Sequence, residues 1–414
     1  MNIELVTIGT ELLLGLALDT NGTEIARALA GLGVRVSRRT SVADRSEDIR
    51  DAVSSALERS GAVLTTGGLG PTRDDITKKV VADLFGTPLE FDDSVWASLL
   101  ERFARLERKP AASNRSQAEV PRGATILRNR WGTAPGLWLE GPPGLVIMLP
   151  GVPLEMRRLL EHEVAPRLAA RANDSVIRSL VVRTTGIPES TLAERIGKIE
   201  LEIAPLTLAY LPGLEGVDLR LSAWDLGADE ADRRLRSAAD LLRARAGETV
   251  YGEDESDLAA LVLELARPQG IRLAVAESCT GGLLGARLTD IPGSSDVFVG
   301  GVIAYDNAAK VELLGVPAGL LAEHGAVSEP VARTMAEGAA RRFGVGAAIS
   351  ITGIAGPGGG TPGKPVGTVW IGCALGDDSN ASRILFPGTR QEVRARAAQA
   401  ALHLLYRRLS ASAT

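Results

Sequence analysis

The sequence has very few of the residues from which disulfide frameworks and many metal centres are built. Its 414 residues include two cysteines and three histidines. The cysteines, Cys279 and Cys373, give no disulfide framework and suit a reducing cytoplasm. The histidines, at positions 162, 324 and 403, are far apart and lack the spacing of zinc ligands. We therefore expect no disulfide and no histidine-based zinc site.

Long apolar runs and an excess of positive charge are also missing. No hydrophobic stretch approaches the ~20 residues of a membrane span, and the N-terminus carries no basic region followed by the apolar core of a signal peptide. The formal net charge of −5 argues against a dedicated nucleic-acid-binding protein, which usually presents a basic face. We expect a cytoplasmic protein without membrane or nucleic-acid partners.

Lysine is scarce as well, which makes each lysine near a reactive group more informative. Only six of the 46 basic residues are lysines. Arginine stays protonated in proteins, whereas a lysine can lose its proton and act as a base. A lysine beside a candidate nucleophile therefore favours a chemical role over simple positive charge.

The sequence has the composition of an ordinary globular protein, and the chain is too long to form a single typical core. Hydrophobic residues make up 45% and charged residues 23% of its 414 residues. In the first part, strand-like and helix-like segments alternate, which predicts a doubly wound α/β domain with ligands at the carboxyl ends of its strands. The predicted segments are strands at 3–8, 34–40 and 62–66 and helices at 20–32 and 47–59.

The polar stretch Arg171 to Ser175 is the expected end of this first domain. From about residue 176 to 246 the pattern is strand, helix, hairpin and helix, which predicts a small α+β module. The acidic segment Gly252 to Asp257 is predicted to be a linker that ends in a helix cap. Beyond it, the alternating pattern predicts a second α/β domain. The expected domains are 1–172, 173–250 and 251–414.

Three segments of the last domain carry reactive or flexible groups, and each directly follows a predicted strand. They are residues 278–282, 305–310 and 352–360. In an α/β sheet, loops that follow strands converge on one edge and line one crevice. We therefore expect the three segments to form one site.

Ser278 is the candidate nucleophile of this site, and it needs a base. The scarcity of histidine disfavours a Ser-His-Asp triad, although His324 stays open as an alternative. Lys310 with Tyr305 offers a base system in which a desolvated, neutral lysine takes the serine proton. Two other interpretations also stay open: Ser278 as a simple helix cap, and Cys279 as a small buried residue or as the nucleophile.

The strings AESCTGG, YDNAAK, HGAVSEP, TGIAGPGGG and KPVGTVW occur in this order and resemble the C-terminal domain of the CinA family, the nicotinamide mononucleotide deamidases. The resemblance covers the whole last domain. It implies hydrolysis of the carboxamide of nicotinamide mononucleotide to nicotinate mononucleotide and ammonia, without a cofactor. It also implies that Ser278 is the nucleophile, Lys310 its base and Tyr305 a proton relay or orienting group.

We expect the substrate to be held around these residues. The backbone N–H groups from Cys279 to Gly281, at the start of a helix, are expected to stabilise the negative charge that develops on the carbonyl oxygen. The substrate phosphate needs a separate anion site, for which Arg390 at the start of the last helix is the candidate. The other candidate substrate-binding residues are Thr280, Gly282, Asn307, Thr352 and Gly353.

A second constellation lies in the first domain. The segment Thr65 to Asp75 follows a predicted strand and precedes a helix predicted from Ile76. Glycines and a helix start suit a phosphate, and Asp74 and Asp75 suit a divalent cation. An equally weighted alternative makes these two acids merely favourable charges in a first helical turn. The further candidates for nucleotide binding are Thr10, Glu11, Gly67, Gly68, Gly70 and Thr72.

The strings IGTELLLG, TNGTEIARAL, SNRSQAEVP, GTAPG and LPGVPLEM resemble the molybdopterin-binding fold that molybdenum-cofactor enzymes share with CinA N-terminal domains. The resemblance covers about residues 1–170. In CinA proteins it implies a metal-dependent ADP-ribose pyrophosphatase that yields AMP and ribose 5-phosphate, with a magnesium- or cobalt-type ion at Asp74 or Asp75. The fold alone does not separate pterin binding from diphosphate hydrolysis.

The expected fold is therefore α/β, with two α/β sandwich domains, molybdopterin-binding-like and CinA-amidase-like, joined by a small α+β module. The expected protein is a cytoplasmic homodimer of pyridine-nucleotide salvage, with nicotinamide mononucleotide and ADP-ribose as its small-molecule partners. Two alternatives stay open. One is a molybdopterin-binding protein whose last domain is not catalytic, and the other is a competence or DNA-associated accessory protein, which the negative charge disfavours.

Overall fold

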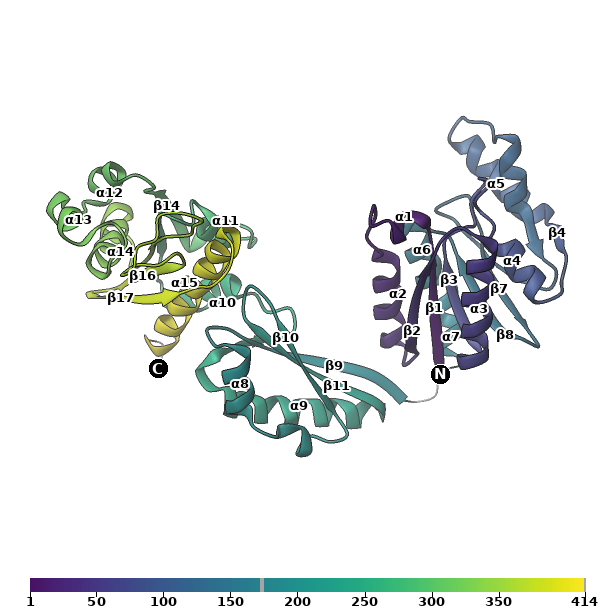
Figure 1. Cartoon of the computed structure of the whole chain (residues 1–414), viewed down its shortest axis with the longest axis horizontal. Helices are drawn as coiled ribbons and strands as arrows, with labels where there is room; N and C mark the ends of the chain where they lie inside the picture. Colours follow the sequence, from purple (N-terminus) through teal and green to yellow (C-terminus); the bar gives the residue numbers. More distant parts are fainter. Residues whose placement is uncertain (172–174, 413–414) are drawn as a thin grey trace. The chain divides into compact units, whose positions relative to one another are not determined.

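The computed structural model describes residues 1–171 and 175–412, which form two compact units (Figure 1). The first unit comprises Met1–Arg178 and Ala223–Arg233, and the second comprises Ser179–Ser222 and Arg234–Thr414. Most of the boundary expected at 171–175 lies outside the described residues, so the exact limits of the three expected domains stay a prediction. In the described ranges, no helix is long and apolar enough to cross a membrane.

The first unit is built around a six-stranded sheet in the order β2-β1-β3-β8-β7-β6. The first four of these strands are parallel to one another. β7 runs antiparallel to β8, and β6 runs antiparallel to β7. Apolar residues alternate along β1, so that Ile3 and Leu5 pack on one face of the sheet and Val6 and Ile8 on the other. The strands are β1 (Asn2–Ile8), β2 (Arg35–Val42), β3 (Ala62–Thr66), β6 (Thr125–Leu127), β7 (Gly136–Gly141) and β8 (Gly144–Leu149).

Helices cover both faces of this sheet, which confirms the predicted doubly wound architecture. Side chains of α2, α6 and α7 pack on one face, and side chains of α3 and α4 pack on the other. The helices are α1 (Thr10–Leu13), α2 (Thr20–Gly31), α3 (Ser46–Ser60), α4 (Thr77–Leu84), α6 (Pro153–Leu159) and α7 (Ala165–Ala169).

Two parts of the first unit differ from the sequence-based expectation. The helical stretch from α6 to α7 contains a π-helical turn, η2 (Leu160–Val164), which the sequence pattern does not distinguish from an α-helix. The segment between α4 and β6 holds elements that the sequence analysis missed because most are short and one is a 3-10 helix. These are β4 (Leu89–Phe91), α5 (Asp93–Arg105), η1 (Ala112–Ala118) and β5 (Glu119–Pro121).

The small α+β module has a four-stranded sheet in the order β10-β11-β9-β12. Asp257 caps the next helix as predicted, because its side chain accepts hydrogen bonds from two N–H groups of the first turn. The rest of the expected linker is partly wrong, since Gly252 and Glu253 pair with β9. The elements are β9 (Ser175–Thr184), α8 (Glu189–Ile196), β10 (Thr207–Pro212), β11 (Val217–Gly227), α9 (Ala228–Ala246) and β12 (Val250–Glu253).

The last domain has a five-stranded sheet in the order β14-β13-β15-β16-β17, in which β14, β13 and β15 are parallel. β16 and β17 extend this sheet in antiparallel fashion. The strands are β13 (Leu273–Glu277), β14 (Phe298–Ile303), β15 (Ala347–Gly353), β16 (Thr368–Leu375) and β17 (Asp378–Leu385).

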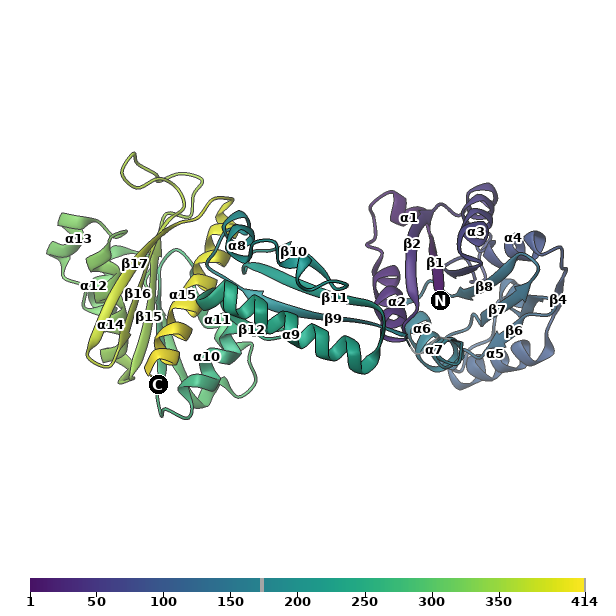
Figure 2. The ribbon, with the colours of Figure 1, turned by 90° about the horizontal axis from the view of Figure 1, so that it is seen from below.

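Helices again cover both faces, which confirms the second α/β domain. The helices α10, α11 and α15 pack on one face, and α12, α13 and α14 lie on the other (Figure 2). The short helices α12 and α13 were not expected from the sequence. The helices are α10 (Leu258–Ala266), α11 (Leu283–Thr289), α12 (Asn307–Leu314), α13 (Ala318–His324), α14 (Glu329–Phe343) and α15 (Arg390–Ser412).

Candidate functional site

Three loops meet at one edge of the sheet in the last domain, as the sequence predicted. β13, β14 and β15 are parallel neighbours, so their carboxyl ends lie at the same edge. The Ala304 N–H donates a hydrogen bond to the Glu277 carbonyl over 2.7 Å. The Ser278 N–H donates to the Ile351 carbonyl over 2.9 Å. The three candidate segments therefore begin side by side.

The turn that carries Ser278 is organised by the residue before it. Glu277 is 1% exposed. Its carboxylate accepts hydrogen bonds from the N–H groups of Gly282 (3.0 Å), Leu284 (3.1 Å) and Gly285 (2.8 Å). The protein's own carboxylate thus binds the N–H groups at the start of α11, including that of Gly282, a candidate substrate-binding residue. These three groups are not the oxyanion donors expected from Cys279 to Gly281, and the role of Glu277 was not expected from the sequence.

Two N–H groups of the turn remain available. The Gly281 N–H donates to the Ser278 carbonyl over 3.1 Å, which removes it from the expected set of oxyanion donors. Among the described residues, the N–H groups of Cys279 and Thr280 have no acceptor on another residue, and the Ser278 hydroxyl has no hydrogen-bond partner. Positive φ angles of 59° and 95° at Gly281 and Gly282 let the chain turn sharply here. The turn therefore presents one hydroxyl and two free donors.

Lys310 is buried beside this turn. It is 1% exposed, and its Nζ donates to the carbonyl oxygens of Ala304 (2.9 Å) and Tyr305 (3.2 Å). The Ala304 N–H is hydrogen-bonded to the carbonyl of Glu277, the last residue of β13. The Lys310 amine, bound to Ala304, therefore lies near the end of β13, directly before Ser278. Burial lowers the pKa of Lys310, against the opposing effects of Asp306 and the Cys279 thiol.

The Tyr305 hydroxyl points to an arginine rather than to the lysine. Tyr305 is 62% exposed, and its hydroxyl accepts a hydrogen bond from Arg390 Nη2 over 2.9 Å. Arg390 Nη1 donates to the Gly356 carbonyl over 2.9 Å. The candidate phosphate-binding arginine therefore connects the second and third loops. The Tyr305 carbonyl, not its hydroxyl, is the group bound to Lys310.

Arg394 is a second arginine at this site, which the sequence analysis missed. Its Nη2 donates to the Thr280 carbonyl over 2.6 Å, and its buried Nε has no hydrogen-bond partner in residues 1–171 and 175–412. Over the same residues, neither Arg390 nor Arg394 forms an ion pair with a carboxylate. Its i, i+4 spacing from Arg390 at the start of a helix is the sequence signal that could have pointed to it.

Cys279 is poorly suited to be the nucleophile. It is 6% exposed, and burial raises the pKa of its thiol to about 11. The thiolate is the reactive form of cysteine, and almost none is present near neutral pH. The interpretation of Cys279 as a small buried residue therefore fits this geometry better than its interpretation as the nucleophile.

Two candidate substrate-binding side chains face the interior instead. Thr280 is fully buried, and Thr352 is 1% exposed with its hydroxyl bonded to the Ala326 carbonyl over 2.9 Å. Thr352 holds its loop through this bond, whereas the Thr280 hydroxyl has no hydrogen-bond partner among the described residues. Burial of both hydroxyls argues against the expected contacts of these side chains with the substrate. Asn307 is exposed at the first turn of α12, and Gly353 ends β15 against the Thr368 carbonyl.

The candidate site of the first unit is a cavity at the carboxyl ends of its parallel strands. Asp74 and Asp75 line it, and so do four of the six residues expected to bind a nucleotide; Thr10 and Thr72 lie outside the lining. The expected residues that line it are Glu11, Gly67, Gly68, Gly70, Asp74 and Asp75. Lining residues that the analysis did not single out include Asp44, Gln117, Thr133, Gly151 and Glu155.

The two aspartates precede α4 instead of forming its first turn, which weakens the alternative that they serve only the helix dipole. Asp75 Oδ2 accepts hydrogen bonds from the Thr72 N–H (2.8 Å) and hydroxyl (2.5 Å). Hydrogen bonding from Thr72 and from its own backbone lowers the pKa of Asp74. No group of three acidic, histidine or cysteine side chains suited to a metal occurs in the described chain.

The glycines of this cavity bring the backbone close to its neighbours. A Cβ on Gly67 would lie 2.2 Å from the Ile8 carbonyl, and one on Gly68 would lie 2.0 Å from Thr77 Oγ1. Both have positive φ angles, 109° and 68°. Only glycine fits at these two positions, because a side chain would collide with the protein's own Ile8 carbonyl or Thr77 hydroxyl.

Glu155 is the least expected carboxyl of this cavity. It is half-buried against Gly132, and Asn129 Nδ2 donates to it over 2.5 Å. Burial raises its pKa, and the Asn129 hydrogen bond opposes that shift. The LPGVPLEM string contains Glu155, but nothing in its local pattern shows that it reaches the aspartate cavity.

The chain matches three family models along its length. Residues 4–170 match "Probable molybdopterin binding domain", residues 179–252 match "Damage-inducible protein CinA KH domain" and residues 255–409 match "CinA C-terminal domain". Among solved structures, competence/damage inducible protein CihA from Agrobacterium tumefaciens is 39% identical, covering 37% of this chain and 93% of that chain with a TM-score of 0.36.

Relatives of full length are also found. A CinA-like protein of Chloroherpeton thalassium is 42% identical, covering 100% of both chains. A CinA-like protein of Gemmatimonas aurantiaca is 54% identical over 411 residues, covering 98% of this chain and 96% of its own. With that identity over almost its whole length, the chain belongs to the CinA family.

Proposed function

We propose that this protein is a nicotinamide mononucleotide deamidase with a second, cation-dependent ADP-ribose pyrophosphatase site in its first unit. The observation that carries the deamidase proposal is the environment of Lys310. A neutral amine has two N–H donors and one lone pair, and two carbonyl oxygens accept from Nζ. Both donors are thereby used, and the lone pair is left free. A protonated amine would bury a third donor without a partner.

The proposed first step is acylation of Ser278. Lys310 takes the hydroxyl proton as Oγ attacks the carboxamide carbon, and the N–H groups of Cys279 and Thr280 stabilise the oxyanion. The C–N bond then breaks, and the proton on Lys310 passes to the leaving nitrogen, which departs as ammonia. Water next attacks the acyl-serine, with Lys310 taking its proton and returning it to Oγ. The carboxylic acid is released and the enzyme is regenerated.

The proposed phosphate site consists of Arg390 and Arg394. Both guanidiniums lie close enough to Cys279 to lower the pKa of its thiol, against the larger effect of burial. Within the described residues, neither guanidinium forms an ion pair with a carboxylate. Two arginines without a counter-charge suit a phosphate, which accepts bidentate hydrogen bonds. Tyr305, held by Arg390, is then an orienting or substrate-contacting group rather than a relay between Ser278 and Lys310.

The proposed second site is the Asp74 cavity. Asp74 and Asp75 would hold a divalent cation together with substrate phosphate oxygens and water, which is the usual coordination of Mg²⁺. The cation would neutralise the diphosphate. Thr72 binds Oδ2 of Asp75 and also contributes a hydrogen bond to Asp74, so Oδ1 of Asp75 and the remaining lone pairs of the Asp74 carboxylate fit this role. The Gly67 N–H is bonded to the Leu149 carbonyl, so the backbone N–H groups of Gly68 and Gly70 would bind the phosphate oxygens.

A nucleic-acid role has less support. KH domains hold nucleic acid with a GXXG loop. In the KH-like module the string Gly213 to Gly216 has this form, but it lies in the β10–β11 turn. Its Glu215 forms ion pairs with Arg183 (3.1 Å) and Arg287 (3.3 Å). Residues 179–252 carry nine basic and twelve acidic side chains, which repels a phosphate backbone.

One experiment tests both activities. Ammonia release from nicotinamide mononucleotide and AMP release from ADP-ribose are measured for the full chain, with magnesium and with a chelator. Ser278→Ala should abolish only ammonia release, and Asp74→Asn should abolish only AMP release. Absence of ammonia release from the wild-type protein would refute the deamidase. Tight binding of a pterin without AMP release would favour the molybdopterin-binding alternative.

A further inference from the structure

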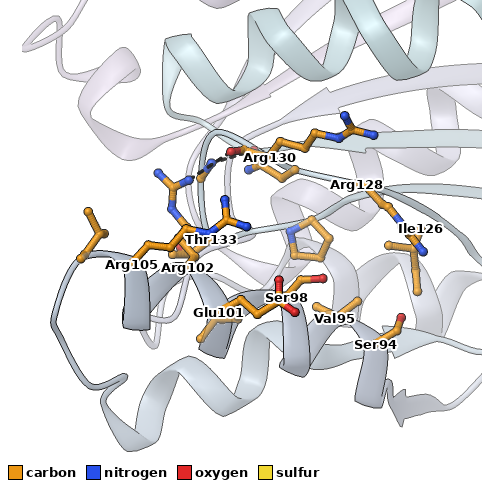
Figure 3. A pocket seen from close by; sticks show the side chains of 15 residues that line it. Ser94, Val95, Ser98, Glu101, Arg102, Arg105, Ile126, Arg128, Arg130 and Thr133 are labelled. Atoms are coloured by element: carbon orange, nitrogen blue, oxygen red, sulfur yellow. Dashed lines mark hydrogen bonds between the residues drawn. The ribbon is translucent and has the colours of Figure 1, made fainter.

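A cavity of about 780 Å³ lies in the first unit, between α5 and the segment that follows β6 (Figure 3). None of the residues proposed above for either activity lines it. Thr133 lines both this cavity and the Asp74 cavity, so the two adjoin. Its volume lies within the range of about 300–1,000 Å³ that is typical of small-molecule sites.

Positive charge is concentrated in this cavity. Arg102 and Arg105 come from α5, and Arg128 and Arg130 come from the segment after β6; Figure 3 shows the four side chains around the cavity. Glu101 is the single acidic side chain of the lining. Across the described chain, none of the four guanidiniums forms an ion pair. This local excess occurs in a protein whose net charge is −5, so it needs a specific explanation.

Arg102 is held in place before any ligand binds. Its Nη1 donates to the Arg130 carbonyl over 3.2 Å, and its Nη2 donates to the Trp131 carbonyl over 2.5 Å. The loop that supplies these carbonyls is fixed in turn, because Asn129 Oδ1 accepts from the N–H groups of Trp131 (3.0 Å) and Gly132 (2.8 Å). A pre-positioned guanidinium binds an anion with a smaller loss of side-chain entropy.

The other walls of the cavity suit the remainder of a small phosphorylated molecule. Hydroxyl groups of Ser98 and Thr133 can donate hydrogen bonds to phosphate or sugar oxygens, whereas the Ser94 hydroxyl already donates to Asp92. Apolar atoms of Leu99 and Ile126 offer contacts for a ring or a sugar face. Guanidinium groups also stack on planar bases. The cavity thus combines charge, hydrogen-bond donors and apolar surface.

We propose that this arginine-lined cavity binds a small phosphorylated metabolite, either a nucleotide or a sugar phosphate, through its phosphate groups. A concave site of this volume accepts a small polyanion better than a duplex, whose phosphates lie on a convex surface. The site needs no cation, since the arginines themselves neutralise the phosphate. It therefore differs in chemistry from the acidic Asp74 cavity and does not depend on the proposed pyrophosphatase activity.

The test is calorimetric titration of the full-length protein with inorganic pyrophosphate, ribose 5-phosphate and AMP, in the presence of a chelator. An Arg390→Gln background removes the contribution of the proposed deamidase phosphate site. We expect binding that weakens by about tenfold or more in Arg128→Gln/Arg130→Gln, because two phosphate contacts are lost. In the described chain these two side chains form no hydrogen bond, so the fold should tolerate the change.

Arg108→Gln is the matched control, since Arg108 is exposed just after α5 and does not line the cavity. Its affinity should change by less than about twofold. Tighter binding of AMP than of ribose 5-phosphate would identify a nucleotide site, and the reverse order would identify a sugar-phosphate site. No binding of any probe at millimolar concentration, or equal losses in Arg108→Gln and the double variant, would overturn the proposal. Tighter binding of a single-stranded oligonucleotide than of AMP would also overturn it.

Discussion

Arg390 Nη2 donates a hydrogen bond to the Tyr305 hydroxyl over 2.9 Å, which joins two loops 85 residues apart in the sequence. Through Nη1 the same guanidinium binds the Gly356 carbonyl, and one helical turn later Arg394 binds the Thr280 carbonyl. The start of α15 therefore contacts all three loops of the candidate site. The last helix does not only complete the core; it also sets the spacing of the loops around Ser278.

Replacing Arg390 by lysine should weaken binding of the substrate phosphate. Lysine retains the charge, but its compact ammonium lacks the planar fork with which a guanidinium spans Tyr305, Gly356 and a phosphate. We expect KM for nicotinamide mononucleotide to rise about tenfold or more, with a much smaller effect on nicotinamide riboside, which has no phosphate. Steady-state ammonia release with both substrates measures this. The matched control is Arg396→Lys, two turns along α15. Equal losses on both substrates would show that Arg390 serves loop structure alone.

Substitution of two adjacent residues separates the possible nucleophiles. Ser278→Ala should reduce kcat to background, whereas Cys279→Ala should leave it within about tenfold of wild type, because the raised pKa of Cys279 keeps it a thiol. Single-turnover ammonia release measures both. The serine mechanism fails if only the cysteine variant is inactive.

The pH dependence of turnover reports on Lys310. The base must be neutral, so kcat/KM should rise with pH and level off above the pKa of Lys310. Because burial lowers that pKa, the midpoint should lie below the usual lysine value of about 10.4. Lys310→Arg should be inactive across the range, since arginine cannot accept the proton. Lys198→Arg, at an exposed position of the small module, is the control. If the Lys310→Arg variant turned over substrate at the wild-type rate, Lys310 would be excluded as the base.

Much of this architecture could be predicted from sequence, because it depends on local patterns. The alternation of apolar residues along β1 and the glycines at positions 281 and 282 are readable without a structure. What could not be read is which donor meets which acceptor. The capping of α11 by Glu277 depends on burial of an acidic side chain at the end of an apolar run. The contacts of Arg394 depend on how α15 packs against residues more than a hundred positions away.

Glu277→Gln should therefore damage the turn that presents Ser278. An amide has one acceptor oxygen where the carboxylate has two, so at least one of the N–H groups of Gly282, Leu284 and Gly285 loses its partner. We expect a loss of about 1–3 kcal/mol in unfolding free energy together with a lower kcat. Urea unfolding and ammonia release are measured side by side. Glu264→Gln, an exposed position on α10, should change neither. An unaffected Glu277→Gln protein would contradict the capping role.

Lys78 should make the stability of the first unit depend on pH in the alkaline range. Its side chain is 6% exposed, Nζ donates to the Ser116 carbonyl, and burial lowers its pKa to about 8. In the unfolded chain the pKa is about 10.4. Below about pH 8 both states carry the proton, and the folded state buries the charge at a cost. Between about pH 8 and 10.4 the unfolded state binds more protons, so stability rises with pH, by about 3 kcal/mol in total.

Lys78→Met removes this rise, although it also loses the bond to Ser116 at every pH. The unfolding free energy of the wild type should therefore rise relative to that of the variant between pH 8 and 10. The lost bond to Ser116 adds a difference that does not depend on pH. Urea unfolding followed by tryptophan fluorescence suits the measurement, because four of the five tryptophans belong to the first unit. Lys79→Met, at the exposed neighbouring position, should show no such shift. A wild-type-to-Lys78→Met difference that stays constant from pH 7 to 10 would mean that Lys78 keeps an ordinary pKa in the folded protein.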